Sequence, residues 1–207
     1  MANAITLSRL PLLLIAVVML YQPSAGWRLA AAVLIVVIIA LDGIDGIVAR
    51  AWDEVSDLGS VLDIAVDRVV EQVLWIVYAS LGLIPVWAPL IVVARGVMTD
   101  AVRAYVLGKG ETAFGMMQSR WGQILVSNRP MRAIYGAAKT IAFVYLALLA
   151  AAHVAWPGTP QAQWLPVLDD IAWWLTLFVV GLTVVRGIPV FIEARRFFSS
   201  PPSSPTR

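Results

Sequence analysis

The sequence predicts an all-α integral membrane protein with six transmembrane helices and both termini in the cytoplasm. Of its 207 residues, 60% are hydrophobic and only 14% are charged, whereas about a quarter of the residues in soluble domains are charged. The apolar segments approach the roughly 20 residues that a helix needs to cross a bilayer, and they lack the alternating pattern of transmembrane β-strands. Basic residues gather in alternate loops, which sets the orientation.

Six apolar segments follow one another along the chain. The predicted spans are Ser8–Gln22, Leu29–Ile47, Gly59–Leu83, Val86–Leu107, Arg132–Val154 and Ile171–Phe191. Helix breakers stand between the two spans of each successive pair. They are Pro23 and Gly26 between the first and second spans, Gly82 and Pro85 between the third and fourth, and Pro157, Gly158 and Pro160 between the fifth and sixth. We expect residues 1–198 to form one membrane domain. Residues 199–207 are rich in Ser and Pro and predict a disordered cytoplasmic tail.

Lysine and arginine residues are enriched in cytoplasmic loops. The loops after the second and fourth spans and the C-terminal segment hold Arg50, Lys109, Arg120, Arg129, Arg195, Arg196 and Arg207. The three opposite loops hold only Arg28. We therefore expect a multi-pass protein of the cell (plasma) membrane, surrounded by membrane lipids, in which an active site near these loops would face the cytoplasm.

The composition removes several classes of chemistry. The chain has no cysteine, and His153 is its single histidine, so disulfides, thiolate sites and histidine-rich zinc sites are excluded. A metal must therefore bind to oxygen ligands, which favours Mg²⁺, Mn²⁺ or Ca²⁺. The formal net charge of +2 is too small to indicate nucleic-acid binding.

Four aspartates stand near the cytoplasmic ends of the second and third spans. Asp42 and Asp45 are three residues apart, and Asp63 and Asp67 are four apart, so each pair lies on one face of its helix. The short connection makes the two helices a hairpin in which the four carboxylates can converge. The charged residues expected in the solvated loop between them are Asp53, Glu54 and Asp57.

Carboxylates that lie close together at low dielectric repel one another, and they either take up protons or bind cations. Two divalent ions would neutralise four carboxylates and give a two-metal site of oxygen ligands. Gly46 and Gly59 leave room beside such a site for a bulky anion, and Arg50 is placed for phosphate oxygens. Glu71, in the same predicted span as Asp63 and Asp67, is a candidate partner of Arg68 or of the metals.

Eight fixed positions lie between residues 42 and 67, in the pattern Asp42-x2-Asp45-Gly46-x2-Ala49-Arg50-x8-Gly59-x3-Asp63-x3-Asp67. This pattern resembles the full signature of the CDP-alcohol phosphotransferases. The six-span plan also resembles that family, so the similarity extends over nearly the whole chain. Family members transfer a substituted phosphoryl group from a CDP-linked donor to an alcohol and release CMP.

The resemblance implies a role for each matching residue. The residues implied to ligate two divalent ions, Mg²⁺ or Mn²⁺, are Asp42, Asp45, Asp63 and Asp67. The residues implied to line the CDP site are Gly46, Arg50 and Gly59. In addition, Asp67 would be the catalytic base that takes the proton of the acceptor hydroxyl.

The run Asn3-x2-Thr6-x2-Arg9 at the start of the first span resembles a segment found in many relatives. Two interpretations are open for it. The resemblance implies a contact with the nucleotide. The residues alone fit equally well with a helix start that lies in the membrane interface, with Asn3 as N-cap and Arg9 on a lipid phosphate.

Basic residues inside the later apolar segments predict an acceptor pocket. They are Arg95, Arg103, Lys139 and Arg186, whereas Arg129 and Arg132 fit the membrane interface better. Several cations favour an acceptor with a phosphate group. The surroundings of Arg95 and Lys139 resemble phosphatidylglycerophosphate synthases, which implies glycerol 3-phosphate. Gly96 and Ala137 stand where those enzymes carry Glu and Lys, so inositol phosphate or another alcohol is an alternative.

The leading expectation is a membrane phosphatidyltransferase of phospholipid synthesis that uses CDP-diacylglycerol and a small alcohol. A divalent-cation transporter is the alternative from another class, because buried aspartates also line ion paths. A non-catalytic membrane scaffold is a third. The apolar helix faces permit a homodimer, and no nucleic-acid partner is expected.

Overall fold

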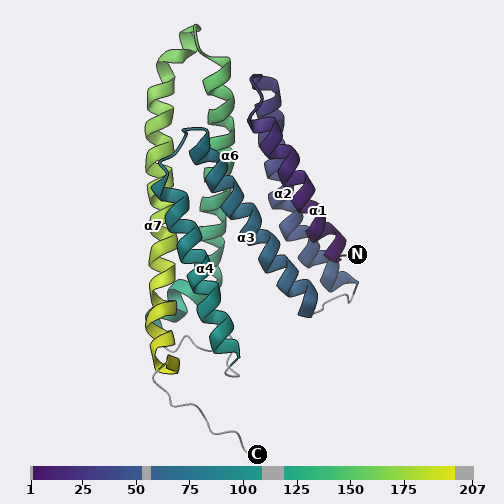
Figure 1. Ribbon diagram of the computed structural model, residues 1–207, viewed down its shortest axis with the longest axis vertical. Coiled ribbons are helices and arrows are strands. Elements are labelled where there is room, and N and C mark those ends of the chain that lie inside the picture. Colours follow the sequence, from purple (N-terminus) through teal and green to yellow (C-terminus); the bar gives the residue numbers. More distant parts are fainter. Residues whose placement is uncertain (1, 53–56, 109–118, 199–207) are drawn as a thin grey trace, which may run out of the picture. The chain divides into compact units, whose positions relative to one another are not determined.

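The computed structural model describes residues 2–52, 57–108 and 119–198, and all regular structure in these ranges is helical (Figure 1). The elements are α1 (Ala2–Leu20), α2 (Ala25–Ala51), α3 (Asp57–Ser80), α4 (Trp87–Leu107), α5 (Arg120–Gly122), the π-helical turn η1 (Gln123–Ser127), α6 (Arg129–Ala155), the 3₁₀ turn η2 (Pro160–Trp164) and α7 (Leu165–Phe198). The all-α prediction is confirmed for these residues. The predicted tail, residues 199–207, lies outside them.

The chain divides into two compact units. The first comprises Met1–Leu90 and Ala138–Val179, and the second comprises Ile91–Ala137 and Val180–Arg207. Helices α4, α6 and α7 therefore contribute residues to both units. Each unit has buried apolar residues of its own.

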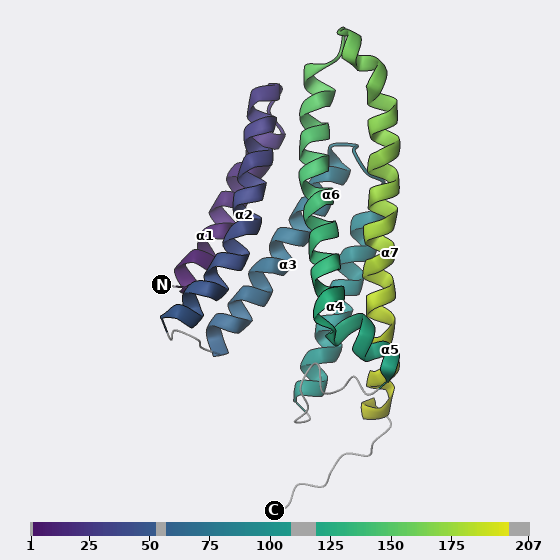
Figure 2. The same ribbon diagram turned by 180° about the vertical axis from the view of Figure 1, so that it is seen from behind.

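In the first unit, α1 packs against α2 and α3 (Figures 1 and 2). Each helix buries apolar residues spaced three or four positions apart, as the packing of one helix face requires. The buried residues include Leu13, Ala16 and Leu20 in α1, Ala31, Ile35 and Ile38 in α2, and Val66, Val70 and Leu74 in α3. Leu14, Ile15, Val18 and Val33 are largely exposed, so the outer faces are apolar, as contact with lipid requires.

Tyr78 joins α3 to α6 inside the first unit. Its hydroxyl donates a 2.7 Å hydrogen bond to the backbone carbonyl of Phe143, and its side chain is fully buried. Trp75, one turn earlier, meets the Phe143 ring edge-on with 5.4 Å between the ring centroids. Arg28 donates a 2.9 Å hydrogen bond to the carbonyl of Ala150. Helix α6 is thus fixed to both α3 and the start of α2.

Gly82 ends α3 with a φ of 76°, a backbone conformation that glycine adopts without strain. Its N–H donates to the carbonyl of Ala79, and the N–H of Leu83 donates to the carbonyl of Tyr78, each at 3.0 Å. This pair of bonds is a Schellman cap, which satisfies carbonyls at the helix end. The predicted break at Gly82 and Pro85 is confirmed.

Four stretches of the described chain are long and apolar enough to cross a membrane. They are Asn3–Leu20, Ala25–Ile44, Pro130–Ala155 and Pro160–Arg195, and they correspond to the first, second, fifth and sixth predicted spans. Helices α3 and α4 form at the other two, but both carry more charge. Their charged residues include Asp63, Asp67, Arg68 and Glu71 in α3 and Arg95, Asp100 and Arg103 in α4.

The six-span topology and the cytoplasmic termini therefore stay predictions. Several of the basic residues on which the orientation depends are only partly described. Lys109 and Arg207, and the side chains of Arg50, Arg129 and Arg196, lie outside the described part of the structure.

In the second unit, α4, η1 and α7 share a small apolar core. It consists of Val106, Val126, Val190 and Ala194, with Val102 and Leu125 packed against it. Ser119 begins α5 as its N-cap, because its hydroxyl accepts a 3.1 Å hydrogen bond from the N–H of Gly122. The N–H of Ser119 donates to the Glu193 carboxylate at 2.8 Å, which ties α5 to α7.

Replacing Tyr78 with Phe is expected to lower the free energy of unfolding by about 0.5–1.5 kcal/mol, because a buried hydrogen bond is lost. Tyr145→Phe is the matched control, since it loses a 2.8 Å bond to the carbonyl of Leu168 in a less buried setting, and it should cost less. Unfolding of the purified proteins in mixed micelles measures both. Equal stability of Tyr78→Phe and the wild type would contradict the expectation.

Candidate active site

Two of the predicted carboxylates meet at one buried arginine. Arg9 of α1 places its Nη1 2.6 Å from Asp42 Oδ1 of α2 and 3.7 Å from Asp63 Oδ1 of α3. All three residues belong to the first unit. The structure therefore brings Asp42 and Asp63 together from two successive helices.

Arg9 lies inside the helix packing, with 1% of its surface exposed, and Thr6 on the same face of α1 is 4% exposed. A buried guanidinium is costly unless it is paired, so Arg9 requires its carboxylates. Of the two interpretations left open for this segment, the one that places Arg9 on a lipid phosphate is wrong, because the side chain is covered. Asn3 as N-cap is also wrong, because α1 already begins at Ala2. A nucleotide contact of Asn3 and Thr6 stays a prediction.

The two carboxylates themselves are accessible. The side chains of Asp42 and Asp63 are 41% and 48% exposed, whereas that of Arg9 is 2% exposed. The two aspartate side chains are therefore partly accessible, whereas the guanidinium and the Asp63 Oδ1 that faces it are buried. Asp67 follows Asp63 by one helical turn and is half-buried, so it lies on the same face of α3.

The other signature positions are only partly described. Four of them lie within α2 but outside the part of the chain whose side chains the structure describes, namely Asp45, Gly46, Ala49 and Arg50. Gly59 lies in the first turn of α3 and is half-buried. Of the predicted loop residues, Asp53 and Glu54 lie outside the described residues. Asp57 begins α3 instead of lying in the loop, in keeping with the preference of carboxylates for helix N-termini.

The donor chemistry of this cluster suits a hard divalent cation. Mg²⁺ and Mn²⁺ prefer carboxylate oxygens, and Asp42 and Asp63 bring two partly exposed carboxylates together from two helices. Among the described side chains, no group of three or more acidic or histidine residues gathers. The side chain of Asp67, a predicted ligand, is described and does not complete such a group with Asp42 and Asp63. The side chain of Asp45, another predicted ligand, is not described, so the described residues fit part of the predicted metal site.

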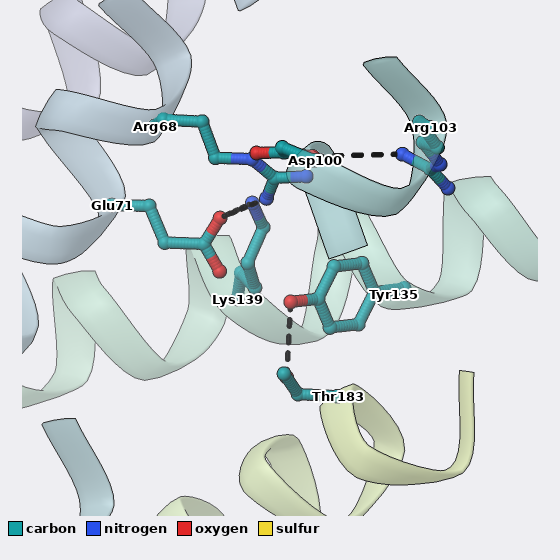
Figure 3. A network of polar contacts seen from close by, with 7 residues as sticks. All are labelled: Arg68, Glu71, Asp100, Arg103, Tyr135, Lys139 and Thr183. Carbon is teal, nitrogen blue, oxygen red and sulfur yellow. Dashed lines mark hydrogen bonds and ion pairs between the residues drawn. The ribbon is translucent and has the colours of Figure 1, made fainter. Parts of the chain in front are cut away.

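A second ion-pair network joins α3 to α6 in the first unit (Figure 3). The Glu71 carboxylate lies 3.0 Å from Lys139 Nζ and 3.4 Å from Arg68 Nη1. Because Glu71 is 3% exposed, its charge requires these two cations. The expected pairing with Arg68 is confirmed. The contact with Lys139 did not follow from the sequence, because no local pattern indicates that α6 packs beside α3.

The second unit holds a group of basic and hydroxyl side chains. Arg186 lies over the ring of Tyr135, 5.0 Å from its centroid, and the hydroxyls of Tyr135 and Thr183 are 3.0 Å apart (Figure 3). Arg95 passes so close to Gly187 that a Cβ there would lie 3.1 Å from Arg95 Nε. Arg186 is 9% exposed, and its Nη1 is buried with no hydrogen-bond partner among the described residues. Such a donor suits an anion.

The other basic residues predicted for the acceptor pocket have protein partners. Arg103 pairs with Asp100 one turn earlier in α4, at 3.9 Å (Figure 3). Lys139 pairs with Glu71. Arg132 is exposed, which is compatible with its predicted place at the membrane interface. The structure thus gathers Arg95 and Arg186 with neighbours that the sequence did not indicate.

The chain is similar to known proteins over most of its length. The sequence model of the CDP-alcohol phosphatidyltransferase family matches residues 1–185, which include the whole motif between residues 42 and 67. A CDP-diacylglycerol--glycerol-3-phosphate 3-phosphatidyltransferase from Bacillus subtilis (strain 168) is 26% identical over 138 residues, which cover 59% of this chain and 72% of the relative.

Replacing Glu71 with Gln is expected to lower the free energy of unfolding by about 3 kcal/mol, because Lys139 and Arg68 keep their charges and lose the carboxylate. In the double variant that carries Glu71→Gln and Lys139→Met, the loss of unfolding free energy should be smaller than the sum of the two single losses by about 0.5–3 kcal/mol. The control Asp100→Asn breaks a longer, more exposed pair and should cost about 1 kcal/mol or less. Equal losses for Glu71→Gln and Asp100→Asn would show that the buried Glu71 network stabilises the protein no more than an exposed ion pair does.

Proposed function

Since the chain belongs to the CDP-alcohol phosphatidyltransferase family and is therefore a transferase of phosphate-containing groups, we propose that it moves the phosphatidyl group of CDP-diacylglycerol to glycerol 3-phosphate and releases CMP. The observation that carries this proposal is the approach of Asp42 and Asp63, from two successive helices, to the same buried guanidinium nitrogen of Arg9, with both aspartate side chains partly exposed. The name of the Bacillus subtilis relative supports the choice of donor and acceptor.

The residues that would hold two divalent cations, Mg²⁺ or Mn²⁺, are Asp42, Asp45, Asp63 and Asp67. When bound, these ions supply Lewis-acid stabilisation of negative charge on the diphosphate. On the nucleotide side, the resemblance to the family supports roles for Asn3, Thr6, Gly46, Arg50 and Gly59. We place this site at the cytoplasmic face of the cell membrane, as the distribution of Lys and Arg favours.

Asp67 is the residue we assign to proton transfer. Its carboxylate takes the proton of the acceptor hydroxyl, and the acceptor oxygen forms a bond to the phosphorus of the phosphatidyl group. The bond from that phosphorus to the CMP oxygen breaks, and CMP leaves with the electron pair of that bond. As in other phosphoryl transfers, the protein contributes mainly by positioning the reactants and by stabilising charge.

The basic residues of the second unit support an acceptor that carries a phosphate group. Arg186 is buried, with one guanidinium nitrogen that has no protein hydrogen-bond partner among the described residues. Arg95 lies against Gly187, the residue that follows Arg186, so two cationic side chains share this part of the second unit, and a bound phosphate would offset their charge. Lys139 and Arg103 are weaker candidates because carboxylates of the protein already pair with them.

The reaction is tested by CMP release from membranes that contain the protein, given CDP-diacylglycerol, Mg²⁺ and a set of acceptor alcohols. Glycerol 3-phosphate should support the fastest release. Asp67→Asn should lower the rate by about 100-fold or more, the usual contribution of a general base. Asp169→Asn, which affects an exposed contact with His153, should leave the rate unchanged. An undiminished rate in Asp67→Asn would refute the assignment of the base, and Mn²⁺ uptake without CMP release would favour the transporter alternative.

The acceptor site is tested by two glycines of the same helix. Gly187→Ala places a methyl group against Arg95, so it should raise the KM for glycerol 3-phosphate several-fold with a smaller effect on kcat. Gly181→Ala is the matched control, because its Cβ would meet nothing within 4 Å, while both changes alter the helix propensity equally, by up to about 1 kcal/mol. Equal KM values in the two variants would argue against Arg95 in the acceptor site.

A further inference from the structure

Arg9 has no part in the function as proposed, although it is the most deeply buried charged residue of the described chain. It comes from α1, which contributes none of the proposed metal ligands. Its Nη1 nevertheless approaches two of those ligands, Asp42 at 2.6 Å and Asp63 at 3.7 Å. A positive charge of the protein itself therefore already lies at the carboxylates that a metal would use.

This arrangement relieves two electrostatic costs at once. Two carboxylates close together repel, and the repulsion grows as solvent is withdrawn. A guanidinium buried in helix packing is itself unfavourable without an anion beside it. The contact of Arg9 with Asp42 and Asp63 offsets both costs as long as no metal is present.

A divalent cation at the same two carboxylates would change this balance. The cation and the guanidinium would both be attracted to Asp42 and Asp63, and they would repel each other across a short distance. The metal would also hold the two carboxylates together by itself, so the help of Arg9 in placing them would no longer be needed. The charge of Arg9 should therefore weaken metal binding on balance.

We propose that Arg9 is a positioning residue that serves as the counter-ion of the metal-free site, holding Asp42 and Asp63 together and competing with the divalent cation for them. This inference rests on the proposed function, because it takes Asp42 and Asp63 as metal ligands. It assigns to the N-terminal helix a direct part in setting the affinity for the metal.

The test compares Mn²⁺ affinity and thermal stability in the purified full-length chain, with free Mn²⁺ measured by electron paramagnetic resonance. Arg9→Gln should bind Mn²⁺ several-fold more tightly than the wild type. Arg9→Lys keeps the positive charge and should have an affinity close to that of the wild type. In chelator, the unfolding temperature of Arg9→Gln should be well below that of the wild type, and saturating Mn²⁺ should reduce this difference.

Arg28→Gln is the matched control, because Arg28 is another arginine of the first unit, partly buried, that donates to backbone carbonyls at 2.9 Å and not to carboxylates. It should lower the unfolding temperature equally with and without Mn²⁺ and leave the Mn²⁺ affinity unchanged. If Arg9→Gln folds only when Mn²⁺ is present throughout purification, that result also supports the inference.

Two results would overturn the inference. If Arg9→Gln loses the same stability with and without Mn²⁺ and binds Mn²⁺ no more tightly, or fails to fold in both conditions, Arg9 has a structural role alone and the proposed function stands. If the wild type binds no Mn²⁺, the metal site of the proposed function fails together with the inference.

Discussion

The burial of one guanidinium beneath two carboxylates is the interaction on which the first unit depends. Packing of α1 against α2 and α3 covers Arg9, and a charge within an apolar helix is tolerated when opposite charge lies beside it. Asp42 and Asp63 satisfy that requirement, and the same cation attracts both. The contact that stabilises the packing of three helices thus also gathers residues that the family signature contains.

Other charged side chains in the apolar helices follow the same requirement in different ways. Glu71 is enclosed by Lys139 and Arg68, and this network links α3 to α6 without leaving the carboxylate exposed. Arg186 instead lies against the ring of Tyr135 and retains a buried nitrogen without a hydrogen-bond partner in the described residues. The charge of Glu71 is thus balanced by other residues of the protein, whereas the unbonded nitrogen of Arg186 suits an anionic ligand. This difference is the physical basis for treating the basic group of the second unit as an acceptor site.

Local patterns were sufficient to predict the helices, the break at Gly82 and the approach of Asp42 to Asp63 across a short connection, because each depends on residues close in sequence. The burial of Arg9 could not be predicted, since it depends on which face of α1 packs against α2 and α3. The partner of Lys139 depends in the same way on the packing of α6, which has no local signature. Charge also explains why α3 and α4 are less apolar than expected for membrane spans. Some of their charged residues, such as Asp63 and Arg95, belong to the candidate sites, and others, such as Glu71 and Arg103, form ion pairs within the protein.

Crosslinking tests the proximity of Asp42 and Asp63 most directly. The chain has no cysteine, so Asp42→Cys combined with Asp63→Cys introduces the only two thiols. Every variant also carries Arg9→Gln, because a buried guanidinium left without its carboxylates would itself destabilise the helix packing. A short bifunctional thiol reagent should join them within one chain, as it should join the pair Tyr21→Cys and Ser80→Cys, whose native hydroxyls are in hydrogen-bond contact. Failure of the aspartate pair to crosslink, under conditions in which the Tyr21 and Ser80 pair does so, would contradict a shared carboxylate site.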